Sequence, residues 1–158
     1  MNENIPEKHN SSYRWIVLLL FMVVALLSQI LWLTFAPISS EMAELFHVTT
    51  FDISFLSLVW PIVFVITAIP VGIYIDKKGF KRSVGIGAVF IAVFSILRIF
   101  STINGYNFTL LLISQICAAV SQPFIFGSIT KLAVSWFPEK EQGLATGLVT
   151  IGLFLGMM

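Results

Sequence analysis

Charged residues are scarce in this chain of 158 residues. Lys, Arg, Asp and Glu together make up 11% of it, hydrophobic residues make up 58%, and the mean hydropathy is +0.96. A soluble domain is about 25% charged, so the deficit excludes that class and indicates an integral membrane protein. The net charge of +1 creates no global field that would attract nucleic acid, and we expect no nucleic-acid partner.

Cysteine is nearly absent as well. The single Cys117 excludes an intrachain disulfide, and its apolar surroundings favour a packing role over a reactive thiol. His9 and His47 are the only histidines, and no group of Cys and His has the spacing of metal ligands. We therefore expect no catalytic residue, no metal site and no cofactor, and we do not expect an enzyme.

Long apolar segments dominate the rest of the sequence. No charged residue occurs from Trp15 to Ser40, which exceeds the roughly 20 residues that a membrane-spanning helix needs. After a polar tail at 1–13, we predict an all-α bundle with spanning helices at about 14–36, 53–75, 83–101 and 109–136. A fifth helix at 143–158 is too short to cross a bilayer, so we expect the chain to be the N-terminal part of a longer protein.

The basic residues lie almost entirely on one side of the expected membrane. Eight of the nine occur in the tail or in alternate loops: Lys8, Arg14, Lys77, Lys78, Lys81, Arg82, Lys131 and Lys140. The positive-inside rule then predicts a cytoplasmic N-terminus, and we assign the multi-pass protein to the plasma membrane. Arg98 is the exception, and we expect its long side chain to extend outward to the interface.

The loop between the second and third predicted helices has a regular spacing. Its residues follow the pattern Gly72-x-x-x-Asp76-Lys77-x-Gly79-x-Lys81-Arg82. A glycine at position 72 would let two helices approach closely, and Gly79 would permit a turn that other residues resist. Asp76 needs a basic side chain or a helix N-terminus as a partner. On charge alone, the loop would be a positively charged anchor at the cytoplasmic membrane surface with no further role.

This spacing resembles the loop signature G-x-x-x-D-[RK]-x-G-[RK]-[RK] of the major facilitator superfamily. Residues 136–147, WFPEKEQGLATG, are similar to that family's passage from its fourth to its fifth helix. The resemblance implies the first four to five helices of a transporter's N-terminal six-helix half, a secondary active alternating-access mechanism and a gating role for the loop. Phe80 and Gln142 stand where the family often has basic residues, and the partner of Asp76 is expected in the remaining C-terminal part.

Polar side chains inside the predicted spans supply a candidate substrate cavity. Gln29 and Trp32 share a face of the first helix, and Gln115 and Gln122, seven residues apart, share a face of the fourth. Hydrogen bonding between helices by the glutamines and interfacial anchoring by the tryptophan stay open as alternatives. In the family that the loop resembles, the first and fourth helices line the central cavity, which implies that all four residues contact a small organic solute.

Two further segments, LWLTFAPIS and SQPFIFGSITKLAVSWF, narrow the resemblance. They are similar to the feline leukemia virus subgroup C receptor-related transporters, which carry choline, ethanolamine or, as has been proposed, haem. This implies that Trp32 and Gln122 contact an organic cation, which a tryptophan face attracts. The expected partners are therefore this solute, the lipid bilayer and the C-terminal part of the transporter.

Helix–helix contacts suggest an alternative from another class. Gly143-x-x-x-Gly147 in the fifth segment is a spacing that we expect to serve close helix packing. A small non-transporting membrane adaptor or assembly subunit, acting through such contacts, remains open, as does the product of a decayed transporter gene.

Overall fold

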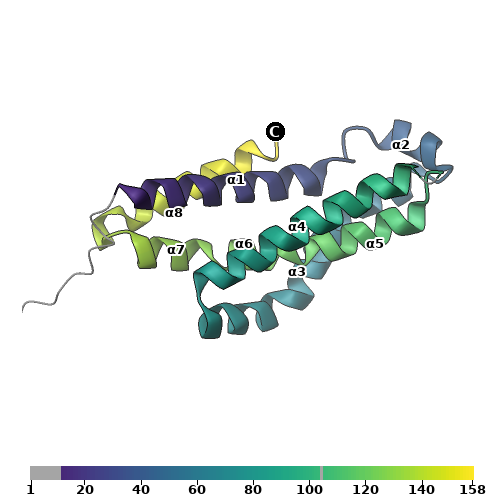
Figure 1. Cartoon of the computed structure of the whole chain (residues 1–158). Coiled ribbons are helices and arrows are strands. Elements are labelled where there is room, and N and C mark those ends of the chain that lie inside the picture. Colours follow the sequence, from purple (N-terminus) through teal and green to yellow (C-terminus); the bar gives the residue numbers. More distant parts are fainter. Residues whose placement is uncertain (1–11, 104) are drawn as a thin grey trace, which may run out of the picture.

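The structure is a computed structural model that describes residues 12–103 and 105–158. Within these residues the chain is helical and has no strand, which confirms the all-α prediction. The elements are α1 (Tyr13–Leu33), α2 (Ser39–Phe46), α3 (Thr50–Lys78), α4 (Phe80–Ile103), α5 (Phe108–Ala119), α6 (Ser121–Phe126), α7 (Ile129–Trp136) and α8 (Glu139–Leu155). The longer helices run along a common axis, with α1 beside α8 (Figure 1). The predicted tail falls mostly outside the described residues.

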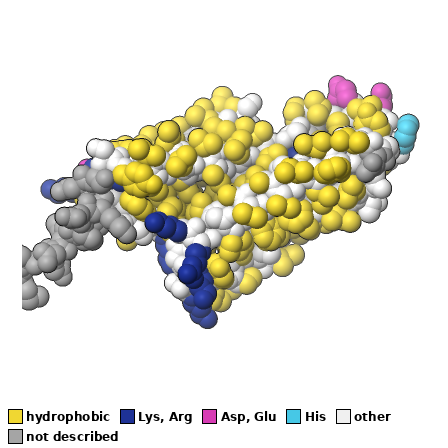
Figure 2. All heavy atoms as spheres, in the orientation of Figure 1, with side chains coloured by type: hydrophobic (Ala, Val, Ile, Leu, Met, Phe, Trp, Pro, Cys, Tyr) yellow, Lys and Arg dark blue, Asp and Glu magenta, His cyan; other side chains and the backbone are white. Residues whose placement is uncertain are grey.

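Four segments of the described chain are long and apolar enough to cross a membrane: α1, α3, α4 and residues 108–136. Their outward faces are apolar, and Val65, Ile66 and Ile69 on α3 are 69–75% exposed. Figure 2 shows this apolar surface between two polar ends, with Lys and Arg where α3 meets α4 and Asp, Glu and His near α2. An apolar belt between polar ends is the surface that a bilayer requires.

The second spanning helix is longer than predicted because both of its ends are capped. At its start, Thr49 Oγ1 accepts a hydrogen bond from the backbone N–H of Asp52, and the Asp52 carboxylate accepts one from the N–H of Thr49. This reciprocal capping box satisfies two backbone donors that a helix otherwise leaves free. At its end, Gly79 has φ +79 and donates its N–H to the carbonyl of Ile75. Only one residue therefore separates α3 from α4.

A short helix, α2, lies between the first two predicted spanning helices, where no helix was predicted. It turns Ala43 and Phe46 toward Phe35 at the end of α1, where they are buried with Leu56 and Leu111. The first spanning helix ends at Leu33, three residues earlier than predicted. Pro37 contributes to this early end because a proline disfavours helical geometry in the preceding residue. The cluster seals that end of the bundle.

The fourth spanning segment is divided into α5, α6 and α7 rather than forming one continuous helix. Pro123 has no N–H to donate to the carbonyl of Ala119, which interrupts the helical hydrogen bonds near the first break. At the second break, a Cβ on Gly127 would lie 2.7 Å from the Ile75 side chain and 2.9 Å from the Pro123 carbonyl. The glycine therefore permits the close approach of this segment to α3.

Candidate functional site

Arg98 on α4 points into the helix bundle, so the expectation that it extends outward is wrong. Its Nη2 donates to the carbonyl of Leu31, 3.2 Å away, and to Oε1 of Gln115 on α5. Leu31 lies in the last turn of α1, where carbonyls lack helical partners and carry partial negative charge. The Phe35 ring lies 4.9 Å from the guanidinium carbon. A helix end, an amide and an aromatic face thus replace the water that the guanidinium would otherwise seek.

Trp32 and Gln115 both donate hydrogen bonds to backbone carbonyls of α3. The indole Nε1 of Trp32 is 2.7 Å from the carbonyl of Ser57, and Nε2 of Gln115 is 3.2 Å from that of Leu56. Ser57 lies four residues before Pro61, which has no N–H and so leaves the Ser57 carbonyl without its usual helical donor. Trp32 supplies the donor that the proline removes.

These contacts form a closed sequence of polar interactions across four helices, which we call the polar ring. Its members are the carbonyl of Leu31 and the indole of Trp32 on α1, Arg98 on α4, Gln115 on α5, and the carbonyls of Leu56 and Ser57 on α3. Interactions of this kind fix the relative positions of helices in a membrane, where hydrophobic burial gives little driving force between them.

Several buried polar atoms on the same helices lack a hydrogen-bond partner in the described chain. They are the amide atoms of Gln29, the hydroxyls of Ser57 and Ser95, the indole Nε1 of Trp60 and Nε of Arg98. Unsatisfied buried polar atoms are rare because leaving each one without a partner costs about 1–3 kcal/mol. The Ser57 hydroxyl and Nε of Arg98 belong to residues of the polar ring, and unpartnered atoms at such a position are typical of a place that takes up water or a polar ligand.

The structure joins two of the four predicted cavity residues and leaves two separate. Trp32, half-buried, and Gln115, fully buried, belong to the polar ring. Gln29 is buried one turn before Trp32 and packs under α8, where a Cβ on Gly156 would come 2.9 Å from its own Cβ. Gln122 is buried on α6 and is 5% exposed. No hydrogen bond among the described residues joins it to the polar ring. The four residues thus lie along the bundle interior.

Asp76 in the predicted gating loop has an ion-pair partner within this chain, which corrects the expectation that its partner lies elsewhere. The carboxylate of Asp76 is 2.8 Å from Nζ of Lys131 on α7. The same ammonium group donates to the carbonyl of Ile75, 3.0 Å away, in the last turn of α3. Lys131 therefore links α7 to the C-terminal end of α3 by charge and by a second hydrogen bond to the Ile75 carbonyl, which also accepts the N–H of Gly79.

The other loop residues divide between the protein and the solvent. Gly79 occupies a positive-φ conformation, as its predicted turn role requires. Lys81 lies 5.9 Å from the Trp136 ring centroid, and Lys77 and Arg82 are exposed. A Cβ on Gly72 would meet nothing within 4 Å, so the close helix approach predicted there is not found among the described residues.

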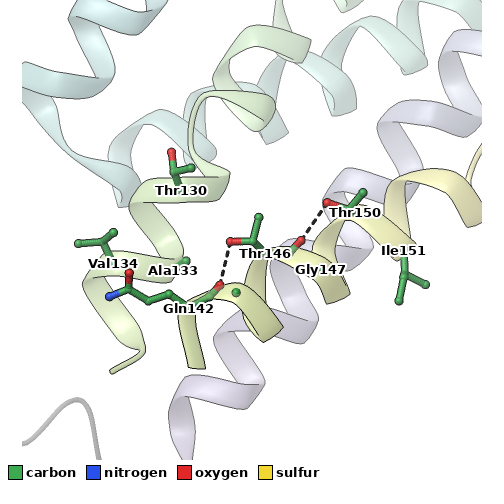
Figure 3. A pocket seen from close by; sticks show the side chains of 9 residues that line it. Thr130, Ala133, Val134, Gln142, Thr146, Gly147, Thr150 and Ile151 are labelled. Atoms are coloured by element: carbon green, nitrogen blue, oxygen red, sulfur yellow. Dashed lines mark hydrogen bonds between the residues drawn. The ribbon is translucent and has the colours of Figure 1, made fainter. Parts of the chain in front are cut away.

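A groove of about 670 Å³ lies between α7 and α8 (Figure 3). Gly143 and Gly147 line it, and a Cβ on either would meet no atom within 4 Å, so the close packing predicted for this pair is wrong within the described chain. Close contact occurs instead where Gly156 lies against α1. The hydroxyls of Thr146 and Thr150 donate to carbonyls of their own helix (Figure 3). This groove thus contains fewer unsatisfied groups than the polar ring.

Comparison with known proteins shows which family the chain belongs to. The sequence profile of the Major Facilitator Superfamily matches residues 17–158. The chain belongs to the major facilitator superfamily. This membership confirms the resemblance inferred from the loop and points to a transporter rather than an enzyme. Together with the apolar helices, it supports a multi-pass membrane protein.

Individual relatives within the superfamily agree with the narrower resemblance. The chain is 26% identical to the mouse choline/ethanolamine transporter FLVCR1 over 151 residues, 96% of this chain and 27% of the relative. It is 28% identical to solute carrier family 49 member A3 of Xenopus tropicalis, over 92% of this chain and 32% of the relative. It is 24% identical to rat choline/ethanolamine transporter FLVCR2, over 93% and 27% respectively. The chain thus spans about a third or less of these relatives.

Sequence reasoning missed two parts of this candidate site. Arg98 was set aside because a single basic residue near a helix end commonly reaches the interface. The Ser57 carbonyl was not considered, although Pro61 four residues later is a signal that this acceptor lacks its helical donor.

Proposed function

We propose that the protein is a secondary active transporter that moves a small organic solute across the plasma membrane by alternating access. In this proposal the chain supplies the first helices of the N-terminal half, and the remaining C-terminal part completes the central site. The Lys and Arg side chains that gather at the end of the bundle where α3 meets α4 support an N-terminus in the cytoplasm. Superfamily membership supports the mechanism.

The polar ring is the observation that carries the proposal. A bundle that only needed to pack would satisfy its buried polar groups internally, because each unsatisfied group is costly in a membrane. Here Trp32, Gln115 and Arg98 join four helices, while the buried amide of Gln29 on α1 has no hydrogen-bond partner in the described chain. A solute that enters between the two halves of a transporter would meet such groups.

The proposed solute is an organic cation that contacts Gln29, Trp32, Gln115 and Gln122. The mouse and rat relatives are choline/ethanolamine transporters, which supports a solute of this class. The hydrogen bond to the Ser57 carbonyl uses the N–H edge of the Trp32 indole and does not involve the two faces of the ring. An aromatic face attracts a quaternary ammonium group by about 0.5–2 kcal/mol.

The loop from Gly72 to Arg82 is proposed to be the cytoplasmic gate. Asp76 and Lys131 form its fixed element, Gly79 sets the turn, and Lys77, Lys81 and Arg82 supply the positive charge that would meet the other half. The short connection between α3 and α4 supports this role because movement of either helix displaces the charged residues directly.

Uptake of radiolabelled choline by the full-length protein in proteoliposomes tests the proposal. We expect saturable uptake, a KM about tenfold higher or more in Trp32→Ala, and a smaller change in Trp32→Phe, because phenylalanine keeps an aromatic face. Trp15→Phe, at the exposed start of α1, is the matched control and should behave like the wild type. The 158-residue chain alone should show no saturable uptake.

Equal choline affinity in the wild type and Trp32→Ala would remove Trp32 from the site. Saturable uptake by the isolated 158-residue chain would contradict the proposal that a C-terminal half is required. Saturable uptake of another solute class with none for choline would retain the transporter but refute the choline-like cation.

A further inference from the structure

Arg98 carries a charge that no acidic side chain of the described chain neutralises. The ion pairs found among the described residues are Arg14 with Glu141 and Lys131 with Asp76, both at the basic end of the bundle. Among residues 12–103 and 105–158, the Arg98 guanidinium interacts with neutral groups: a backbone carbonyl, an amide oxygen and an aromatic ring. A cation in a membrane interior without a counter-ion is costly, and such residues are commonly functional.

Several hydrogen-bond donors on α3 and α4 lack an acceptor in the described chain. Nε of Arg98 and Nε1 of Trp60 can only donate, and both lack an acceptor in the described chain. The hydroxyl of Ser95, one turn before Arg98 on α4, and that of Ser57, one turn before Trp60 on α3, are also unpartnered. A guanidinium that has a free N–H and no counter-ion in the described chain is suited to an anionic group.

Arg98 is also held in place rather than free to move to the surface. Its Nη2 is fixed between the carbonyl of Leu31 and the amide of Gln115, and Gln115 is in turn bonded to α3. The guanidinium is therefore pre-organised, and a ligand would lose little side-chain freedom on binding. Trp32, the proposed cation-binding residue, follows Leu31 directly and bonds to the adjacent helix α3.

We propose that Arg98 binds a small monoanionic group beside Trp32, and that this group is the carboxylate of a zwitterionic solute. The inference rests on the proposed function in one respect, which is that the solute enters at the polar ring. A positive group would lie on the Trp32 face and the carboxylate would accept hydrogen bonds from Arg98. A separate inorganic anion, such as chloride, has the same chemistry, and the experiment distinguishes the two sources.

Choline and glycine betaine are the probes, because both carry a trimethylammonium group and only betaine adds a carboxylate. Their dissociation constants are measured by calorimetry on the purified full-length protein, once with methanesulfonate and once with chloride as the buffer anion. We expect betaine to bind the wild type about tenfold or more tightly than choline in methanesulfonate. This preference should disappear in Arg98→Gln and be reduced in Arg98→Lys, which keeps the charge but loses the planar fork.

Ile99→Val, at the adjacent exposed position on α4, is the matched control and should keep the wild-type preference. If chloride raises the affinity for choline in the wild type but not in Arg98→Gln, an inorganic anion occupies the site, which supports anion binding and refutes the carboxylate source. Arg98→Lys and the wild-type preference keep the test decisive if Arg98→Gln does not fold.

An equal betaine-to-choline ratio in the wild type and Arg98→Gln overturns the assignment, as does a wild type with neither a carboxylate preference nor a chloride effect. Saturable uptake together with either result would leave the transporter proposal intact. An Arg98-dependent betaine preference without uptake would support the anion site and refute the transport proposal.

Discussion

The hydrogen bond between Trp32 and Ser57 should depend on Pro61. In Trp32→Phe the Ser57 carbonyl loses its donor, and no helical N–H replaces it because position 61 is proline. Hydrogen bonds between membrane helices contribute about 0.6 kcal/mol on average and up to about 1.7. The 2.7 Å distance, with no other donor to the Ser57 carbonyl among the described residues, places this bond at the upper end, so we expect Trp32→Phe to cost about 1–2 kcal/mol.

Pro61→Ala restores an N–H four residues after Ser57. In that background the carbonyl has a helical donor, so Trp32→Phe should cost little, and the double-mutant cycle should give a coupling energy of about 1 kcal/mol. Unfolding of the full-length protein in mixed micelles, followed by circular dichroism, measures the four free energies. Pro70→Ala is the control, because the carbonyl that Pro70 leaves free lies elsewhere on α3 and its coupling to Trp32 should be near zero. Equal costs of Trp32→Phe in both Pro61 backgrounds would refute the reasoning.

Three further predictions concern the loop and the glycine contacts, each measured by the same unfolding assay. Lys131→Gln should destabilise the protein more than Asp76→Asn. The ion pair itself contributes about 0–1 kcal/mol because the Asp76 side chain is 75% exposed, whereas Lys131 also donates to a carbonyl at the end of α3. Equal effects of the two substitutions would contradict this capping role. Gly79→Ala should cost about 1–3 kcal/mol at φ +79, whereas Gly72→Ala, with open space at Cβ, should be nearly neutral or stabilising. Gly156→Ala should weaken the α1–α8 contact by about 1–3 kcal/mol, since the added Cβ would clash with α1, and an unchanged stability would show that α8 can shift.

The helix content and the membrane class could be predicted from the sequence because they depend on long apolar segments, which tertiary contacts do not alter. The spanning helices lie where hydropathy places them, and α3 differs only at its ends, where the Thr49–Asp52 capping box and Gly79 decide the limits. The helix α2 was missed because it has only eight residues, of which Ala43 and Phe46 are buried. A helical pattern of apolar residues cannot be recognised over so short a segment.

The partners of charged residues could not be predicted, because they depend on which helices become neighbours. Arg98 lies inside the bundle because the end of α1 brings an unpaired carbonyl to it, and α5 brings Gln115. Asp76 pairs with Lys131 because the breaks in the fourth span allow α7 to approach the end of α3. Neither spatial relation is expressed in the spacing of the sequence.

Trp32 combines a structural and a proposed functional role on different parts of one side chain. Its N–H edge is bonded to Ser57, which fixes the orientation of the ring, and its faces are the part that would attract a cation. Trp32→Phe removes the edge and keeps a face, whereas Trp32→Ala removes both. A variant Trp32→Phe that loses stability but retains affinity would therefore assign the bond to the scaffold and the face to the solute. Loss of affinity in Trp32→Phe that Pro61→Ala restores would instead show that binding needs the Ser57 carbonyl to be paired, whichever group donates to it.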